Sequence, residues 1–181
     1  NACTNVYSEG GDSPLGMRWL GSGSRQDGRS ASLTAPSGQA QQGVIVAALG
    51  DGGLHPLEVS VLEAHGTGTG LGDPIEAGAV GQIFVAQWKG GDGPFCIGSA
   101  KANAGHTEPG AGLTGALKLL QQLQSAQMCP NAQLRVLNPQ VGLGLQCTDA
   151  AALPGQLCAV PAAAGGALAG GVSSLGCAGA I

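Results

Sequence analysis

The stretch LEVSVLEAHGTGTGLGDPIE, residues 57–76, predicts a strand, a glycine-rich loop and a helix in direct succession. Its first eight residues form a short apolar run of strand length, and the glycines after it cannot continue a strand. Asp73 is a favourable helix N-cap, and Glu76 stands where its carboxylate can reach back to the N-cap amide. We therefore expect His65 to lie at the end of a strand, with a helix beginning soon after it.

The same order of elements follows again further along the chain. Residues 95–97 form a second short apolar strand, and residues 101–106 form a loop that ends on His106. Thr107-Glu108-Pro109 can start another helix. In an α/β sheet such loops meet at the carboxyl edge of the strands, where ligands bind. His65 and His106 are therefore predicted to converge on one pocket.

The helix after His106 has an apolar face in the sequence pattern. It carries Leu113, Ala116, Leu117, Leu120 and Leu123. Three glycines, at positions 110, 112 and 115, each weaken this helix by about 1 kcal/mol relative to Ala. Close packing of the helix backbone against a neighbour is the expected compensation.

The remaining segments give weaker signals. Residues 40–49 have apolar positions at helical spacing and end at a glycine-rich turn, so they predict a helix. The opening residues, through position 24, are expected to be loop with one strand at residues 17–20. After Gln127 the chain is irregular, and residues 171–175 predict a final strand.

Composition narrows the class of protein. Hydrophobic residues make up 43% of the 181 positions, charged residues 10%, and the net charge is -4, which disfavours nucleic acid as a partner. No apolar run approaches the roughly 20 residues of a membrane span, and no targeting signal is visible. The six cysteines form no CxxC pair, so a reducing compartment, cytoplasmic or plastid, is expected.

Three other interpretations of the histidines compete with catalysis. A single histidine in a globular domain is often only a hydrogen-bonded structural residue. A metal site would need a third ligand, and the sequence around His65 and His106 offers none at metal-ligand spacing, so no metal is expected. The glycine-rich residues 66–72 fit neither the dinucleotide-binding nor the phosphate-loop pattern.

Four blocks, in order, resemble the β-ketoacyl synthase (ketosynthase) domain of type I modular polyketide synthases. They are QDGRS (26–30) with LTAP (33–36), EAHGTGT (63–69) with LGDPIEA (71–77), GSAKANAGHTE (98–108) and GVSSLG (171–176). The resemblance covers residues 22–181, with residues 1–21 as a divergent N-terminal segment. It implies an α/β thiolase-like fold, layered αβαβα, of which this chain is the second half only, with a mixed sheet flanked by helices.

The resemblance also implies an activity, which is decarboxylative Claisen condensation of a malonyl-type extender with an acyl thioester in polyketide or fatty acid chain elongation. His65 and His106 would donate N–H groups to the thioester oxygen, and Lys101 would organise the second histidine loop. Thr67 and Thr69 would bind the pantetheine arm, and the backbone N–H of Cys177 would belong to the oxyanion hole. The implied partner is an acyl carrier protein that carries the phosphopantetheine, so no cofactor would bind directly. A homodimer of the complete domain is implied as well.

Some positions depart from the family pattern. The family nucleophile is a cysteine far upstream of the first histidine, so we expect it, with the N-terminal half, outside this sequence. Cys3 is too close to the QDGRS block for that role, and we expect this chain alone to elongate no acyl thioester. Arg25 replaces a usual Asn, and the chain ends at Ile181 before a usual Asn-Ala-His. The alternative hypothesis is therefore an inactive remnant that acts as a structural or carrier-protein interaction module.

Overall fold

A computed structural model describes residues 2–10, 16–26, 36–88, 93–146, 149–162 and 166–176. Within them, six strands form one sheet in the order β2-β1-β8-β3-β4-β6. Their bounds are β2 (Met17–Arg25), β1 (Ala2–Glu9), β8 (Ala169–Leu175), β3 (Val61–Glu63), β4 (Phe95–Gly98) and β6 (Ala151–Ala152). A separate small ladder pairs β5 (Gln127–Met128) with β7 (Cys158–Ala159).

The main sheet is mixed, as predicted. β3 pairs in parallel with β4 on one side and with β8 on the other, and β6 continues the parallel half. β1 pairs antiparallel with both β2 and β8, so it joins an antiparallel half to the parallel one. The two short strands before the histidine loops therefore lie side by side near the middle of the sheet.

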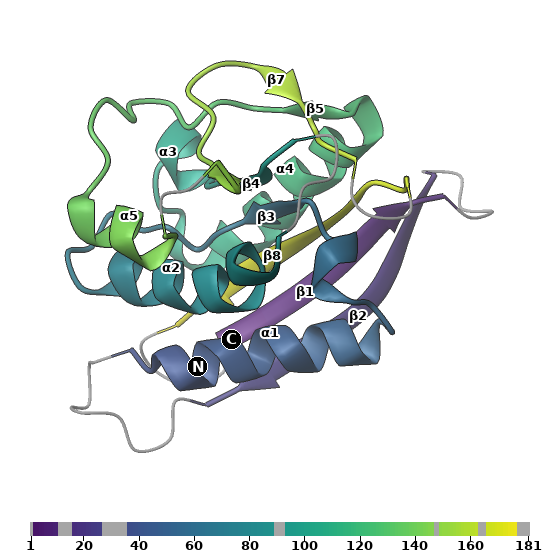
Figure 1. Cartoon of the computed structure of the whole chain (residues 1–181), viewed down its shortest axis with the longest axis horizontal. Helices are drawn as coiled ribbons and strands as arrows, with labels where there is room; N and C mark the ends of the chain where they lie inside the picture. Colours follow the sequence, from purple (N-terminus) through teal and green to yellow (C-terminus); the bar gives the residue numbers. More distant parts are fainter. Residues whose placement is uncertain are drawn as a thin grey trace.

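Helices cover both faces of the sheet (Figure 1). α1 (Gly38–Asp51) and α2 (Gly72–Ile83) pack on one face, and α4 (Ala111–Ser125) packs on the other. α5 (Pro139–Gly144) lies against α2, and α3 (Lys101–Ala104) is a single turn after β4. Alternate residues of β3 divide between the two cores: Leu62 packs with α1 and α2, whereas Val61 packs with Leu119 of α4. This alternation is the normal consequence of strand pleating.

The prediction for the N-terminus was wrong in part. The strand at residues 17–20 is confirmed and extends to Arg25, but residues 2–9 form a full strand, β1, instead of loop. β1 is held on one side by β8, with Thr4 opposite Ser173, far away in sequence. A pairing partner so distant in sequence leaves no local signal.

Two smaller elements also differ from the prediction. The strand expected at residues 57–64 is shortened to β3 because Pro56 begins a 3₁₀ turn, η1 (Pro56–Glu58), capped by His55 and Glu58. The loop expected at residues 101–106 contains the short helix α3. Two further 3₁₀ turns, η2 (Val85–Gln87) and η3 (Glu108–Gly110), follow α2 and precede α4.

The buried face of α4 agrees with the predicted one only in part, at Ala116 and Leu123. Leu113 and Leu117 are 67% and 60% exposed, whereas Leu119 and Leu123 are fully buried. The helix carries its own leucines on more than one face, so the spacing of apolar residues could not predict which face is buried. Gly115 decides the orientation, because a Cβ there would lie 3.1 Å from Glu63 Cγ and 3.2 Å from Val172 Cγ2. The predicted close packing of a glycine backbone is confirmed at this position.

In the described part of the chain, none of the helices is both long enough and apolar enough to cross a bilayer.

Candidate active site

The parallel pairing of β3 with β4 sets the two histidine loops beside each other. Glu63 pairs with Gly98 at the last position of each strand. His65 follows two residues after the end of β3, and His106 follows the short helix α3 after β4. The structure thus brings together two residues that are 41 positions apart in the sequence.

The two imidazole rings are in contact. Their centroids lie 5.6 Å apart, and the ring planes are at 89°, an edge-to-face arrangement. His65 is partly buried, whereas His106 is exposed. The predicted convergence of the two rings is therefore present in the fold.

Backbone amides fix which nitrogen of each ring carries the proton. Nδ1 of His65 accepts a hydrogen bond of 3.2 Å from the backbone N–H of Leu175, in β8. Nδ1 of His106 accepts one of 3.2 Å from the backbone N–H of Glu108. A neutral imidazole that accepts at Nδ1 carries its hydrogen on Nε2. Both rings are thereby prepared as Nε2–H donors.

His65 is held in the neutral form. Burial, together with the nearby charges of Lys101 and His106, lowers the pKa of His65 to about 4. At neutral pH the ring is therefore uncharged and can donate one N–H without losing its proton.

Two carboxylates that were expected to cap a helix instead bind the loop after His65. Glu76 is buried, and its two oxygens accept hydrogen bonds from the backbone N–H groups of His65 and Gly66, at 2.7 and 2.9 Å. Asp73 accepts in the same way from Gly68 and Thr69. α2 starts at Gly72, two residues before the predicted first helical residue, Pro74, and has no side-chain cap. The N-cap prediction was wrong, because four loop amides compete for these carboxylates.

Lys101 and Ser99 connect the second loop to the first. The backbone N–H of Lys101 donates to Ser99 Oγ at 3.3 Å. Ser99 Oγ also lies 3.3 Å from the carbonyl oxygen of Gly66 and 3.4 Å from that of His65. Burial lowers the pKa of Lys101, and the carboxylates of Glu76, Glu63 and Asp73 oppose this shift. Three carboxylates therefore favour the charged form of Lys101.

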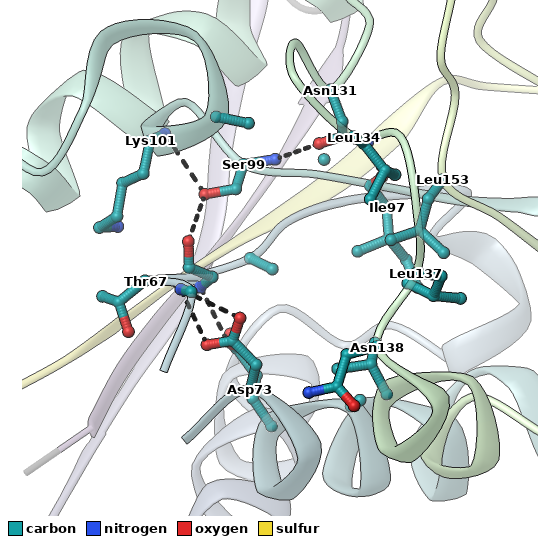
Figure 2. Close-up of a pocket in the computed structure, with 18 of the residues that line it drawn as sticks. Thr67, Asp73, Ile97, Ser99, Lys101, Asn131, Leu134, Leu137, Asn138 and Leu153 are labelled. Carbon is teal, nitrogen blue, oxygen red and sulfur yellow. Dashed lines mark hydrogen bonds between the residues drawn. The ribbon is translucent and has the colours of Figure 1, made fainter. Parts of the chain in front are cut away.

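A cavity of about 540 Å³ opens between these loops and the segment after β5. One wall is polar and includes Thr67, Thr69, Lys101 and His106. In Figure 2 the apolar side chains Leu134, Leu137 and Leu153 face this wall from the opposite side. His65 is not among the described residues that line the cavity. It contacts His106, which does line the cavity. The volume lies within the range of small-molecule sites.

Some predicted site residues stay untested. Cys177, proposed for the oxyanion hole, lies outside the described residues, as do most positions of the QDGRS and LTAP blocks. Cys3 lies within β1, between two partner strands, rather than before a helix. In the described residues no three His, Cys, Asp or Glu side chains gather as a possible metal site.

Sequence reasoning missed three polar residues that support the loops. Asn131 accepts from the N–H of Ser99 at 3.0 Å and donates to the carbonyl of Ile97 at 3.0 Å. Glu63 and Lys118 form an ion pair with an N–O distance of 2.6 Å. A carboxylate at the end of a buried apolar strand was the available signal for Glu63, because such a charge needs a partner.

Comparison with known proteins gives a consistent result. The family model described as "Beta-ketoacyl synthase, C-terminal domain" matches residues 18–135. Phenolphthiocerol synthesis polyketide synthase type I Pks15/1 of Mycobacterium bovis is 45% identical over 121 residues, which are 67% of this chain and 6% of that protein. Erythronolide synthase EryA2 of Saccharopolyspora erythraea is 45% identical over 121 residues, with coverages of 67% and 3%.

Solved structures agree with this. An oxazolomycin ketosynthase domain of Streptomyces albus superposes with a TM-score of 0.66 at 32% identity, covering 80% of this chain and 25% of that one. The ketosynthase from module 6 of the bacillaene synthase of Bacillus subtilis gives 0.66 at 30% identity, with coverages of 82% and 27%. The chain therefore spans about a quarter of these ketosynthase chains, and the fold is thiolase-like.

Proposed function

Because the chain belongs to the β-ketoacyl synthase family, as part of its C-terminal domain, we propose that it supplies the two histidine donors of a ketosynthase domain. The reaction would be decarboxylative condensation of a malonyl-type extender with an acyl thioester. The observation that carries this proposal is the pair of contacting rings, each with Nδ1 occupied by a backbone N–H. Each ring then carries its hydrogen on Nε2, and the two N–H groups would serve one substrate oxygen.

The chemistry needs such donors at the moment when charge develops. When the malonyl thioester loses carbon dioxide, the C–C bond breaks and its electron pair moves onto the thioester oxygen as an enolate. The enolate carbon then attacks the acyl thioester, a C–C bond forms, and the C–S bond breaks to release the thiolate of the acyl-bearing cysteine. A fixed N–H donor at such an oxygen contributes roughly 3 kcal/mol to lowering the barrier. A neutral His65 suits this role, because it donates a hydrogen bond without transferring a proton.

The other predicted residues fit the same proposal. Lys101 would organise the loop of His106, since its backbone is tied to Ser99 at the base of the site. Thr67 and Thr69 line the cavity and would bind the pantetheine arm of an acyl carrier protein. The phosphopantetheine would arrive on that carrier rather than bind as a cofactor of this chain. The backbone N–H of Cys177 remains our proposal for the oxyanion hole of the acyl thioester.

The alternative of an inactive remnant is not favoured. Loss of catalysis would relax the need for two ring orientations, but both rings keep a backbone hydrogen bond at Nδ1. The buried carboxylate of Glu76 likewise accepts hydrogen bonds from the backbone N–H groups of His65 and Gly66. These contacts support retained donor function.

The test uses a ketosynthase domain that contains this chain. His106→Ala should abolish decarboxylation of malonyl-carrier protein, because one of two enolate donors is lost, while self-acylation of the nucleophile continues. His55→Ala is the matched control: His55 is exposed and caps η1, so both activities should persist. Decarboxylation at the unsubstituted rate in His106→Ala would show that the role of this histidine is misassigned.

A further inference from the structure

A buried ion pair lies directly beneath the two histidine loops. Glu63 is the last residue of β3, two positions before His65, and is only 2% exposed. Its Oε2 lies 2.6 Å from Nζ of Lys118, in the middle of α4, whose side chain is 13% exposed. The pair joins β3, which leads into the loop of His65, to α4, which packs on the face of the sheet opposite α1 and α2.

The second oxygen of the same carboxylate holds the second loop. Oε1 of Glu63 accepts the backbone N–H of Ala100, the residue that precedes α3 and Lys101. From there Lys101 N–H binds Ser99 Oγ, which also lies within hydrogen-bond distance of the carbonyl oxygens of His65 and Gly66. One carboxylate therefore connects to both loops within a short chain of hydrogen bonds.

Two glycines make room for this pair. A Cβ on Gly98 would lie 3.0 Å from Nζ of Lys118, and a Cβ on Gly115 would lie 3.1 Å from Cγ of Glu63. Backbone thus encloses both charged groups closely. A buried ion pair often stabilises a protein no more than an apolar replacement of equal size. Stability alone therefore does not explain why Glu63 and Lys118 are buried as an ion pair.

We propose that Glu63 and Lys118 form a positioning pair: Lys118 keeps Glu63 ionised, and ionised Glu63 fixes the start of α3 and thereby Lys101 relative to the loop of His65. An ionised carboxylate accepts hydrogen bonds at both oxygens, whereas a protonated one must donate from one of them. The catalytic consequence rests on the proposed function, but the structural consequence does not.

The charges around Glu63 determine what loss of Lys118 would do. Burial raises the pKa of Glu63, and Lys118 from α4 and Lys101 from α3 oppose that rise. Replacing Lys118 with Met removes the larger opposing charge, so the pKa of Glu63 rises further and the carboxyl stays protonated up to higher pH values. As the pH increases, Glu63 in that variant ionises and regains its second acceptor.

The first test follows the Ala100 amide proton by NMR in the chain itself. In Lys118→Met the chemical shift of the Ala100 amide proton should follow the ionisation of Glu63. The change should occur at higher pH than in the unsubstituted chain. In Glu63→Gln/Lys118→Met, which has no charge at either position of the pair and should fold even if the single variant does not, the titration should be absent. Gln121→Met, an exposed change on the same helix, is the control and should match the unsubstituted chain. An Ala100 shift that is independent of Lys118 would overturn the proposal.

The second test is catalytic and uses the ketosynthase domain that contains the chain. Lys118→Met should lower kcat for malonyl decarboxylation on the order of tenfold or more at neutral pH, because small misplacements of catalytic loops are costly. KM should stay unchanged, and kcat should recover as the pH rises. Equal kcat and an equal pH profile in Lys118→Met and Gln121→Met would also overturn the proposal. If the unsubstituted domain decarboxylates nothing, the proposed function fails, and the Ala100 titration still decides the role of the pair.

Discussion

At the scale of single residues, one backbone amide per histidine determines what each imidazole can do. Leu175 N–H occupies Nδ1 of His65, and Glu108 N–H occupies Nδ1 of His106. The sequence could predict both histidines, because each comes after an apolar strand and belongs to a glycine-containing loop. It could not predict the tautomer of His65, since the amide that fixes it comes from β8, 110 positions away.

The lowered pKa of His65 gives a stability prediction. The pKa of His65 is about 4 in the folded chain and near 6.5 in the unfolded chain. Between these values the unfolded state binds a proton that the folded state does not, so stability should fall as the pH drops from about 6.5 to about 4. We expect this ring to account for about 1 to 2 kcal/mol, less than the full linkage value because it keeps some contact with water.

His65→Gln isolates this contribution from those of the carboxylates, which titrate in an overlapping range. Urea unfolding at a series of pH values would give the free energy of unfolding for both chains. The difference between them should change across the stated range and become constant below it. A difference that does not vary with pH would mean that His65 titrates equally in the folded and unfolded chains.

At the scale of elements, strand ends were easier to predict than helix starts. The positions of β4 and β8 follow from short apolar runs, and both are confirmed. The start of α2 was predicted from Asp73 and Glu76 as capping residues. Both carboxylates bind loop amides instead, because the loop of His65 folds back over the helix N-terminus. Local pattern cannot distinguish a cap from a loop contact when the same side chain suits both.

The orientation of α4 can be tested by two glycine substitutions. Gly115→Ala should destabilise the chain by about 1 to 2 kcal/mol, because its Cβ would crowd Glu63 and Val172, which are both buried in the core. Gly78→Ala in α2 is the matched control, since a Cβ there meets nothing within 4 Å. It should stabilise the chain by about 0.5 to 1 kcal/mol through helix propensity. Unfolding free energies that change with equal sign in both variants would contradict the packing of α4.

At the scale of the whole molecule, the site depends on strand order. β3 lies between β4 and β8, so the loop of His65 meets the loop of His106 on one side and the end of β8 on the other. Two tandem strand–loop–helix units could be predicted from sequence, and so could their convergence. The contribution of β1 could not, because β1 pairs with its neighbour β2 on one side but joins the rest of the sheet through long-range pairing with β8 on the other.

The central claim is that both imidazoles of the folded chain carry a hydrogen on Nε2, while a backbone amide occupies each Nδ1. A long-range proton–nitrogen correlation spectrum of the histidine rings, recorded at neutral pH, tests it most directly. In the folded chain we expect His65 and His106 each to be a single Nε2–H tautomer with unprotonated Nδ1, and unfolding in urea should replace both with tautomer mixtures. A folded chain in which either ring carries its proton on Nδ1, or in which His65 is charged at neutral pH, would contradict the account.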